Sequence, residues 1–260
     1  MAAATLTLVA VPGIPLIRSG DDLSTILIEA LAVAGLAPRN QDVLVIAQKI
    51  VSKAEGRTVR LAEVRPSARA YELAAAVHKD PRFVELVLSE SSEVVRHRRD
   101  VLIAAHRLGF VMANAGIDQS NIEQDEDGED GERALLLPKD PDGTCAALKG
   151  RLDAHFGARM GIVINDSFGR PWRNGVTGVA LGAAGLPALL DLIGEPDLFG
   201  RALKVTQVAL ADEIAAAASL LMGQAAEGRP AVLVRGLAWG ERPALPAQAL
   251  IRPKELDLFR

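Results

Sequence analysis

The order of apolar and polar residues along the chain predicts short buried strands mixed with amphipathic helices. Apolar runs bounded by turn residues predict strands at Leu6–Val11, Asp42–Ala47, Val101–Ala105, Gly109–Ala113, Met160–Ile164, Val176–Leu181 and Ala231–Val234. Helical periodicity with capping residues predicts helices at Asp21–Ala34, Ser67–His78, Asp80–Ser89, Asp142–Phe156 and Val208–Met222. These elements follow no regular βαβ rhythm, so the pattern favours an α+β fold over a doubly wound sheet.

Residues 123–132 interrupt this pattern with a run that is almost wholly charged, EQDEDGEDGE. The run lacks the alternation and the closing glutamate of an EF-hand calcium loop, so a solvated loop is the better interpretation. We find no internal repeat and no linker long enough to force independent domains.

The composition narrows the class of protein. The chain has 260 residues, 49% of them hydrophobic, which suits one large domain or two small ones. A net charge of −4 gives no general attraction to nucleic acid or to anionic membranes. Cys145 is the only cysteine, which excludes an internal disulfide and favours a reducing compartment. Without a signal-peptide start or an apolar run of ~20 residues, we expect a cytoplasmic protein with neither nucleic-acid nor membrane partners.

Two polar segments follow predicted strands and contain candidate metal ligands. Asp118 and Asn121 follow the strand that ends near Ala113, and Asp166 with Ser167 follows the strand that ends at Ile164. Oxygen donors of this kind suit Mg²⁺ or Mn²⁺, which proteins often hold by one or two carboxylates and substrate phosphates. A single aspartate is more often a turn or capping residue, but two such segments together could hold one or two ions beside a polyphosphate.

Basic residues near these segments are candidates for binding anions. Arg170 and Arg173 are three positions apart, so we expect them to share a face only in a helical turn. Their guanidinium groups suit phosphate or carboxylate, with surface salt bridges as the alternative. Trp172, which lies between them, is expected to pack. The segment AQKIVSKAEGR after the second strand contains Lys49, Lys53 and Arg57. A lysine placed there could serve as a point charge for phosphate or belong to an ordinary basic loop.

Known nucleotide-binding and hydrolase motifs do not occur. The sequence contains neither a P-loop nor a Rossmann fingerprint, so a nucleotide would have to bind in another way. The four histidines have no zinc-like spacing, and no serine or cysteine lies in a nucleophile elbow. Covalent hydrolase chemistry is therefore disfavoured.

Seven motifs occur in one order along the chain: PGIPLI (12–17), KIVSKAEGR (49–57), ANAGID-x-SN (113–121), LLLPKDPD (135–142), DSFGRPWRNG (166–175), ADEIAAAA (211–218) and LLMGQ (220–224). Together they resemble the coenzyme F420-0:L-glutamate ligase family, whose members use GTP to add glutamate to the F420 precursor. The resemblance extends from about Val11 to Gly236. It implies a ligase domain over residues 1–236, open to division into two interleaved subdomains, and a C-terminal tail over residues 237–260. It also implies a family-specific α+β fold and an intertwined homodimer.

The resemblance also implies roles for individual residues. Asp118 and Asp166 would bind a first divalent ion. Ser167, where the family commonly has threonine, would bind a second ion together with Gln224. Arg170 and Arg173 would face anionic groups of the precursor, which carries a phosphodiester and a carboxylate. Contacts to GTP would come from Ile14, Pro15, Leu16, Ile17, Lys53, Asn121, Leu220, Leu221, Met222, Gly223, Gln224, Ala225, Ala226 and Glu227.

The implied reaction uses GTP, L-glutamate and F420-0, with two Mg²⁺ or Mn²⁺ ions and with K⁺ as a further candidate ion. It would pass through an acyl phosphate and release GDP and phosphate. No general base is evident in the sequence. Two other interpretations stay open: a two-metal phosphohydrolase using the same site, and a non-catalytic nucleotide-binding protein.

Overall fold

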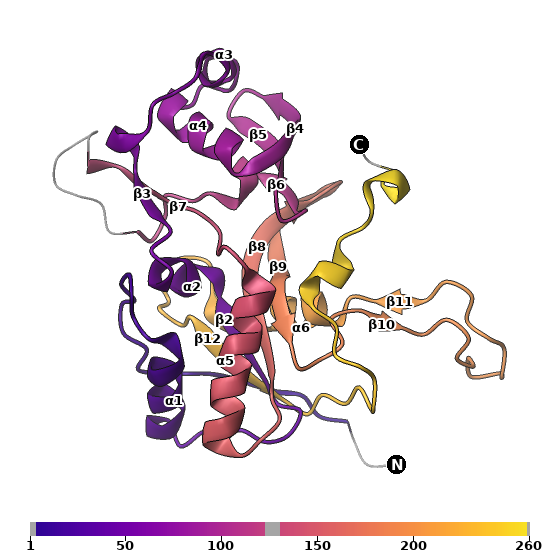
Figure 1. Cartoon of the computed structure of the whole chain (residues 1–260). Coiled ribbons are helices and arrows are strands. Elements are labelled where there is room, and N and C mark those ends of the chain that lie inside the picture. The colour runs from indigo at the N-terminus through magenta and orange to yellow at the C-terminus, as the bar shows by residue number, and fades with distance from the viewer. Residues whose placement is uncertain (1–3, 123–130, 259–260) are drawn as a thin grey trace.

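A mixed five-stranded sheet forms the centre of the computed structural model, which describes residues 4–122 and 131–258 (Figure 1). Its strands, in spatial order, are β1 (Thr7–Ala10), β12 (Ala231–Arg235), β2 (Val43–Ala47), β8 (Gly161–Arg170) and β9 (Arg173–Ala184). Only β2 and β8 are parallel; the other pairs are antiparallel. The predicted α+β class is confirmed.

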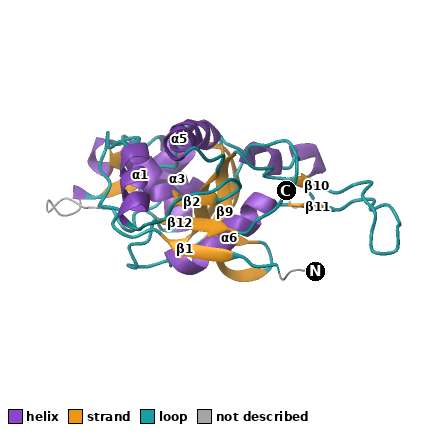
Figure 2. Cartoon of the chain, turned by 90° about the horizontal axis from the view of Figure 1, so that it is seen from below, coloured by secondary structure: helices purple, strands orange, loops and turns teal. Residues whose placement is uncertain are grey.

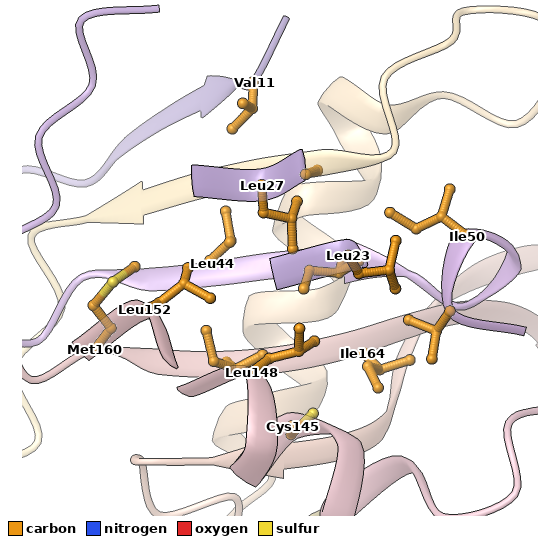
Figure 3. Packing of buried hydrophobic residues seen from close by; sticks show 14 of the residues in the cluster. Val11, Leu23, Leu27, Leu44, Ile50, Cys145, Leu148, Leu152, Met160 and Ile164 are labelled. Carbon is orange, nitrogen blue, oxygen red and sulfur yellow. The ribbon is translucent and has the colours of Figure 1, made fainter. Parts of the chain in front are cut away.

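Alternating side chains of the central strands fill two separate cores. Leu44 and Ile46 of β2 face one core, whereas Val43 and Val45 face the other, as the two-residue period of a strand requires. The first core lies beneath α1 (Leu23–Val33) and α5 (Pro141–Phe156) and includes Cys145 (Figure 3). The second lies beneath α6 (Leu210–Met222). Continuous apolar strands therefore mark a sheet that is covered on both faces.

A smaller layer, formed by residues 57–136, adjoins one end of the central sheet (Figure 1). It contains α3 (Ala68–Val77), α4 (Pro81–Ser89) and the antiparallel strands β4 (Ser91–Arg98), β5 (Val101–His106) and β6 (Val111–Ala113). The short strands β3 (Thr58–Arg60) and β7 (Arg133–Leu135) pair with each other. This layer has its own apolar core and returns the chain to the central sheet at α5.

Buried Glu90 connects the smaller layer to the segment that enters it. Its carboxylate accepts a hydrogen bond of 2.7 Å from Arg57 and lies 2.9 Å from a guanidinium nitrogen of Arg107. The pKa of Glu90 is raised by burial, but the contact with His106 and the two arginine charges hold it below its usual value overall. The Glu90 carboxylate is therefore ionised at neutral pH and paired with the two arginines.

Side-chain caps start α1 at the predicted aspartates and start α5 one residue before the predicted Asp142. Asp22 accepts hydrogen bonds from the backbone amides of Ser24 and Thr25 at the start of α1. Asp140 accepts one from Gly143 at the start of α5, where Pro141 occupies the first turn. Such caps satisfy amides that have no partner within the helix.

The hairpin β8–β9 corrects two sequence predictions. Strand β8 does not end at Ile164 but continues to Arg170, and Pro171 with Trp172 forms the turn into β9. Polar residues continue the strand because this part leaves the apolar core while its backbone remains paired. Trp172 has a positive φ of 58° and is 82% exposed, so it does not pack into the core.

The structure also differs from the sequence predictions in segments whose order of apolar and polar residues is irregular. The segment after β2 is not a loop but the helix α2 (Gln48–Ala54). Val208 belongs to β11 (Gln207–Val208), which pairs with β10 (Leu190–Asp191), and α6 starts only at Leu210. Strand β4 was not predicted, because its eight residues are mostly polar or charged. The acidic run lies mainly outside the described residues.

Two outlying parts complete the fold. Residues 189–208, hereafter the arm, project away from the central sheet around the ribbon β10–β11 (Figures 1 and 2). The C-terminal segment contains two short 3₁₀ helices, η4 (Ala247–Leu250) and η5 (Lys254–Leu256). Further 3₁₀ turns occur at η1 (Leu61–Glu63) and η2 (Asn114–Gly116). None of the described helices has both the length and the apolar character needed to cross a membrane.

Candidate functional site

A left-handed turn after β6 positions Asp118. Asn114, Ala115 and Gly116 have φ values of 52°, 51° and 73°, a conformation that is costly for residues with a Cβ atom. A Cβ at Gly116 would lie within 2.9 Å of three Leu137 side-chain atoms, so only glycine fits there without displacement. The backbone of Asp118 then exchanges hydrogen bonds of 2.8 and 3.1 Å with Leu135, which holds the carboxylate on a rigid support.

Asp118 is paired with Lys49. The distance between Lys49 Nζ and Asp118 Oδ2 is 2.5 Å. The backbone amide of Ser120 donates to Oδ1 at 2.8 Å, and the Ser120 hydroxyl donates to Oδ2 at 3.0 Å. Burial raises the pKa of Asp118, but these donors and the Lys49 charge bring it below its usual value. The side chain is therefore a carboxylate at neutral pH.

The parallel pair β2–β8 brings the two polar segments together. Ala47 at the end of β2 lies opposite Asn165 in β8, so α2 begins beside the position that Asp166 occupies. Lys49 lies in the first turn of α2 and Lys53 one turn later, on the same side of the helix. Lys53 Nζ donates to the backbone oxygen of Asn121 at 2.7 Å.

Asp166 is a partly buried carboxylate with few donors. The backbone amide of Ser167 donates to its Oδ1 at 2.8 Å. Burial raises the pKa of Asp166 to about 6, against the opposing effects of the Ser167 amide and the Lys49 charge, and the Asp118 charge adds to the rise. The Asp118 charge therefore opposes ionisation of Asp166, and the charge of a nearby cation, such as Lys49, favours it.

The segment after α6 reaches both polar segments. The Ser167 hydroxyl donates to Gln224 Oε1 at 2.7 Å, and Asn121 Nδ2 donates to the Ala225 oxygen at 3.1 Å. Gly223, with a φ of 74°, ends α6 and lets the chain turn towards β8. Glu227 accepts a hydrogen bond of 2.8 Å from the Ala225 amide. Residues that are 57 and 104 positions apart in sequence thus form one polar surface.

Other predicted contact residues lie apart from these groups or face the core. Met222 is 8% exposed and Leu221 packs against the second core, whereas Leu220 is 83% exposed. Ile17 is buried and Ile14 packs against the first core.

The arginines lie at the tip of the β8–β9 hairpin. Arg170 and Arg173 are cross-strand partners in the register of the hairpin. The prediction that only a helical turn would place them on one face is therefore wrong, because a two-residue turn brings paired side chains to the same side of a ribbon. Both are exposed, three or more strand positions beyond Asp166.

Ser120 belongs to this site but was not predicted, and Lys49 was a candidate for binding phosphate rather than a partner of Asp118. Both surround Asp118. Their signal was present in the sequence, since Lys49 opens the motif KIVSKAEGR and Ser120 lies in ANAGID-x-SN. Neither motif indicates by itself that the two segments meet.

The donor set suits a hard divalent cation. It consists of the Asp118 and Asp166 carboxylates, the Ser167 hydroxyl and the Gln224 amide oxygen. Within the described part of the chain, no three acidic, histidine or cysteine side chains gather as a complete metal cage. Two carboxylates with neutral oxygens fit Mg²⁺ or Mn²⁺ better than they fit zinc, because magnesium sites usually take the remaining ligands from water and phosphate.

Comparison with known proteins identifies relatives over nearly the whole chain. Residues 13–236 match the family model described as F420-0:Gamma-glutamyl ligase. The chain is 47% identical to the coenzyme F420:L-glutamate ligase of Methanothermobacter thermautotrophicus, over 98% of this chain and 99% of that protein. It is 43% identical to the enzyme of the same name from Methanopyrus kandleri, over 98% of both chains. It is also 43% identical to that of Archaeoglobus fulgidus, over 96% and 94% of the two chains.

Proposed function

The chain belongs to the F420-0:gamma-glutamyl ligase family, and on that premise we propose that it uses GTP to join L-glutamate to F420-0. The relatives bear the name of a coenzyme F420:L-glutamate ligase, which supports the amide-forming activity and its substrates. The use of GTP and the reaction path are what the family resemblance implies, and the chemistry of the polar surface is compatible with them.

One observation carries this proposal. The negative charge of Asp118 raises the pKa of Asp166, and the Ser167–Gln224 hydrogen bond starts at the residue next to Asp166. Two carboxylates and two neutral oxygens, with two lysines at the same strand ends, are suited to holding a polyphosphate through divalent ions.

Asp118 and Asp166 would hold one divalent ion, and Ser167 with Gln224 would complete the ligands of a second. The main reason why these residues suit a divalent ion is Asp166. Burial raises the pKa of its carboxyl group, and a bound cation would stabilise the charged form. When bound, Mg²⁺ or Mn²⁺ ions offset negative charge on the transferred phosphoryl group.

The proposed reaction has two steps. A carboxylate oxygen of F420-0 attacks the γ-phosphorus of GTP, and the bond from that phosphorus to the bridging oxygen breaks, so that GDP leaves and an acyl phosphate forms. The amine nitrogen of L-glutamate then attacks the acyl carbon. The carbon–oxygen bond to phosphate breaks, the nitrogen loses a proton to solvent, and phosphate leaves.

The lysines would bind and orient the phosphates. Lys53, which donates to the Asn121 backbone, lies one helical turn after Lys49 and is suited to a phosphate oxygen as a point charge. Lys49 holds Asp118 ionised and in place. Arg170 and Arg173, paired across the hairpin tip, are suited to the anionic groups of F420-0.

We extend the proposal to a homodimer. The arm exposes Leu198, Phe199 and Val205, which are 100%, 83% and 84% accessible, at a distance from the body (Figures 1 and 2). Large apolar side chains gathered on a projecting ribbon favour burial against another surface. A second copy of the chain is the partner that the family resemblance implies.

The decisive experiment combines the protein with F420-0, GTP, L-glutamate and Mn²⁺ and measures the product mass. A gain of one glutamyl residue, with one GDP and one phosphate released per amide, is the expected result. Phosphate release from GTP without F420-0 and glutamate would instead indicate a phosphohydrolase. Nucleotide binding with no turnover and no metal dependence would indicate a non-catalytic protein.

A further inference from the structure

A cavity of about 270 Å³ lies beside the edge strand β9, outside the polar surface described above. Its walls come from four separate parts of the chain: the β5–β6 turn, the β8–β9 hairpin, the first turn of α6 and the C-terminal segment. The apolar lining consists mainly of Phe110, Val111, Phe168, Val179, Leu250 and Ile251. Asp212 and Arg252 add charged groups.

This cavity begins one strand away from Asp166. Val179 is the cross-strand partner of Asp166, so the two side chains project from the same face of the hairpin. Phe168 lies two residues after Asp166 in β8 and therefore also points to that face. Paired residues of antiparallel strands lie ~5 Å apart, which places the apolar cavity next to the candidate metal ligands.

The cavity lies on the side of β8 opposite to the lysines. In the sheet, β8 separates β2 from β9; Lys49 and Lys53 follow β2, whereas the cavity adjoins β9. The attacking and leaving oxygens of a phosphoryl transfer lie on opposite sides of the phosphorus. If the nucleotide lies along the lysines, the acceptor must approach from the β9 side.

The cavity walls are held in fixed positions. Asp212 accepts a hydrogen bond of 2.9 Å from the Ala180 amide at the edge of β9. Asp142 accepts bonds of 2.8 and 3.1 Å from the Ala247 and Gln248 amides, which attaches the C-terminal segment to α5. Lys254 reaches Glu93 of β4 at 2.5 Å. A preformed cavity of this kind is typical of a small-molecule site.

We infer that this cavity receives the aromatic, apolar part of the acceptor F420-0, with Arg252 at its edge for an anionic group of the same molecule. The inference rests on the proposed function. Two phenyl rings and aliphatic walls suit a flat ring system. The volume falls slightly below the ~300–1,000 Å³ of whole-ligand pockets, which suits one part of a larger molecule.

Two other occupants fit the cavity less well. L-Glutamate carries two carboxylates, and the cavity offers one arginine for them alongside Asp212 and Asp257. The guanine base would have to reach the first turn of α6, whereas the proposed nucleotide contacts lie at its other end. Asp212 and Met222 are ten residues apart in α6, or ~15 Å along the helix axis.

A cavity-filling variant tests the inference. Val179→Phe should raise the Kd and the KM for F420-0 about tenfold or more, because it occupies space that the ring would use. The affinity for GTP should stay within about twofold of the wild type, well below the tenfold that 1.4 kcal/mol represents. Binding of F420-0 is measured by its intrinsic fluorescence without GTP, and GTP binding by calorimetry. Val33→Phe is the matched control, since Val33 is 85% exposed on α1, far from the cavity.

A second variant keeps the inference testable if Val179→Phe does not fold. Arg252→Gln changes an exposed side chain and should also weaken F420-0 binding about tenfold, the loss expected for one hydrogen bond to a charged group. Arg99→Gln, at an exposed turn between β4 and β5, is its control.

The possible outcomes separate the inference from the proposed function. Unchanged F420-0 binding in both cavity variants would overturn the inference. A selective loss of GTP or glutamate affinity would do the same and assign the cavity to that ligand. If the wild-type protein neither binds F420-0 nor forms the amide, the proposed function itself fails.

Discussion

The hydroxyl of Ser167 donates a hydrogen bond of 2.7 Å to the amide oxygen of Gln224, although 57 positions separate the two residues. The contact connects β8 to the segment after α6 and places two neutral oxygens beside Asp166. Five predictions follow from this arrangement and from the parts of the fold that support it.

Asp166→Asn should abolish ligation while leaving the protein folded. An amide of the same size is a poorer metal ligand than a carboxylate, and outer-shell changes alone cost 10- to 100-fold, so we expect a loss of about 100-fold or more. Without metal, the variant should be more stable at pH 8, by up to about 3 kcal/mol, because the raised pKa of Asp166 marks an unfavourable buried charge. Product mass and urea unfolding measure the two effects. Near-normal activity at saturating Mn²⁺ would remove Asp166 from the metal site.

Binding of Mn²⁺ should depend on pH around the pKa of Asp166. This pKa is raised to about 6, so the side chain holds a proton below pH 6 and a metal ion must displace it. The apparent affinity should therefore fall as pH drops from 7 to 5 and level off above about 7. Calorimetric titration at several pH values measures this. An affinity that is flat between pH 5 and 7 in the wild type would contradict the assignment.

Lys53→Met should weaken GTP binding without unfolding the chain, because the aliphatic stem remains and only the charge is lost. A hydrogen bond to a charged group contributes ~1.5–3 kcal/mol, so the dissociation constant should rise roughly 10- to 150-fold. Calorimetry with GTP gives the value. Lys204→Met, an exposed lysine of the arm, is the matched control, and an unchanged GTP affinity in Lys53→Met would exclude this lysine.

Glu90→Gln should destabilise the protein by about 3–5 kcal/mol at pH 7, since removing one member of a buried ion pair leaves the other charge without a partner. The folded-state pKa of Glu90 is lowered. The Glu90 carboxylate therefore contributes fully to the free energy of unfolding above its unfolded-state pKa near 4.5. This contribution is lost as the pH falls through the lower folded-state pKa.

The difference between wild type and Glu90→Gln should consequently shrink in acid. Urea unfolding at pH 7 and pH 3 measures it, with Glu29→Gln as a control at an exposed position of α1. A difference of equal size at both pH values would show that the Glu90 charge does not contribute.

Phe199→Asp should weaken self-association, because it places a charge on the apolar surface of the arm. We expect a dimer for the wild type and a shift towards monomer in the variant at micromolar concentration. Sedimentation equilibrium measures both. Val33→Asp alters an equally exposed valine on α1 and should leave the mass unchanged. A monomeric wild type would refute the dimer.

Local patterns in the sequence determined most of the framework. The apolar run of β2 and the capping signals of α1 and α5 each depend on residues a few positions apart, because strand alternation and helix capping are short-range effects. The mixed order of strands and helices was enough for the α+β class. The motifs around Asp118 and Asp166 identified the family and the polar segments.

Only the tertiary structure decided how these segments meet. Lys49 contacts Asp118 across 69 positions. This contact forms because α2 follows the end of β2, where the smaller layer that carries the turn after β6 adjoins the central sheet (Figure 1). The pairing of Arg170 with Arg173 depends on the register of the β8–β9 hairpin. The sequence did not predict this register, because the residues at the hairpin tip are polar and lack the apolar pattern of a strand.

The cavity beside β9 needs four segments, one of which is the C-terminal segment that Asp142 holds in place. Pairing across long sequence separations is set by the packing of the whole chain, which no local pattern encodes.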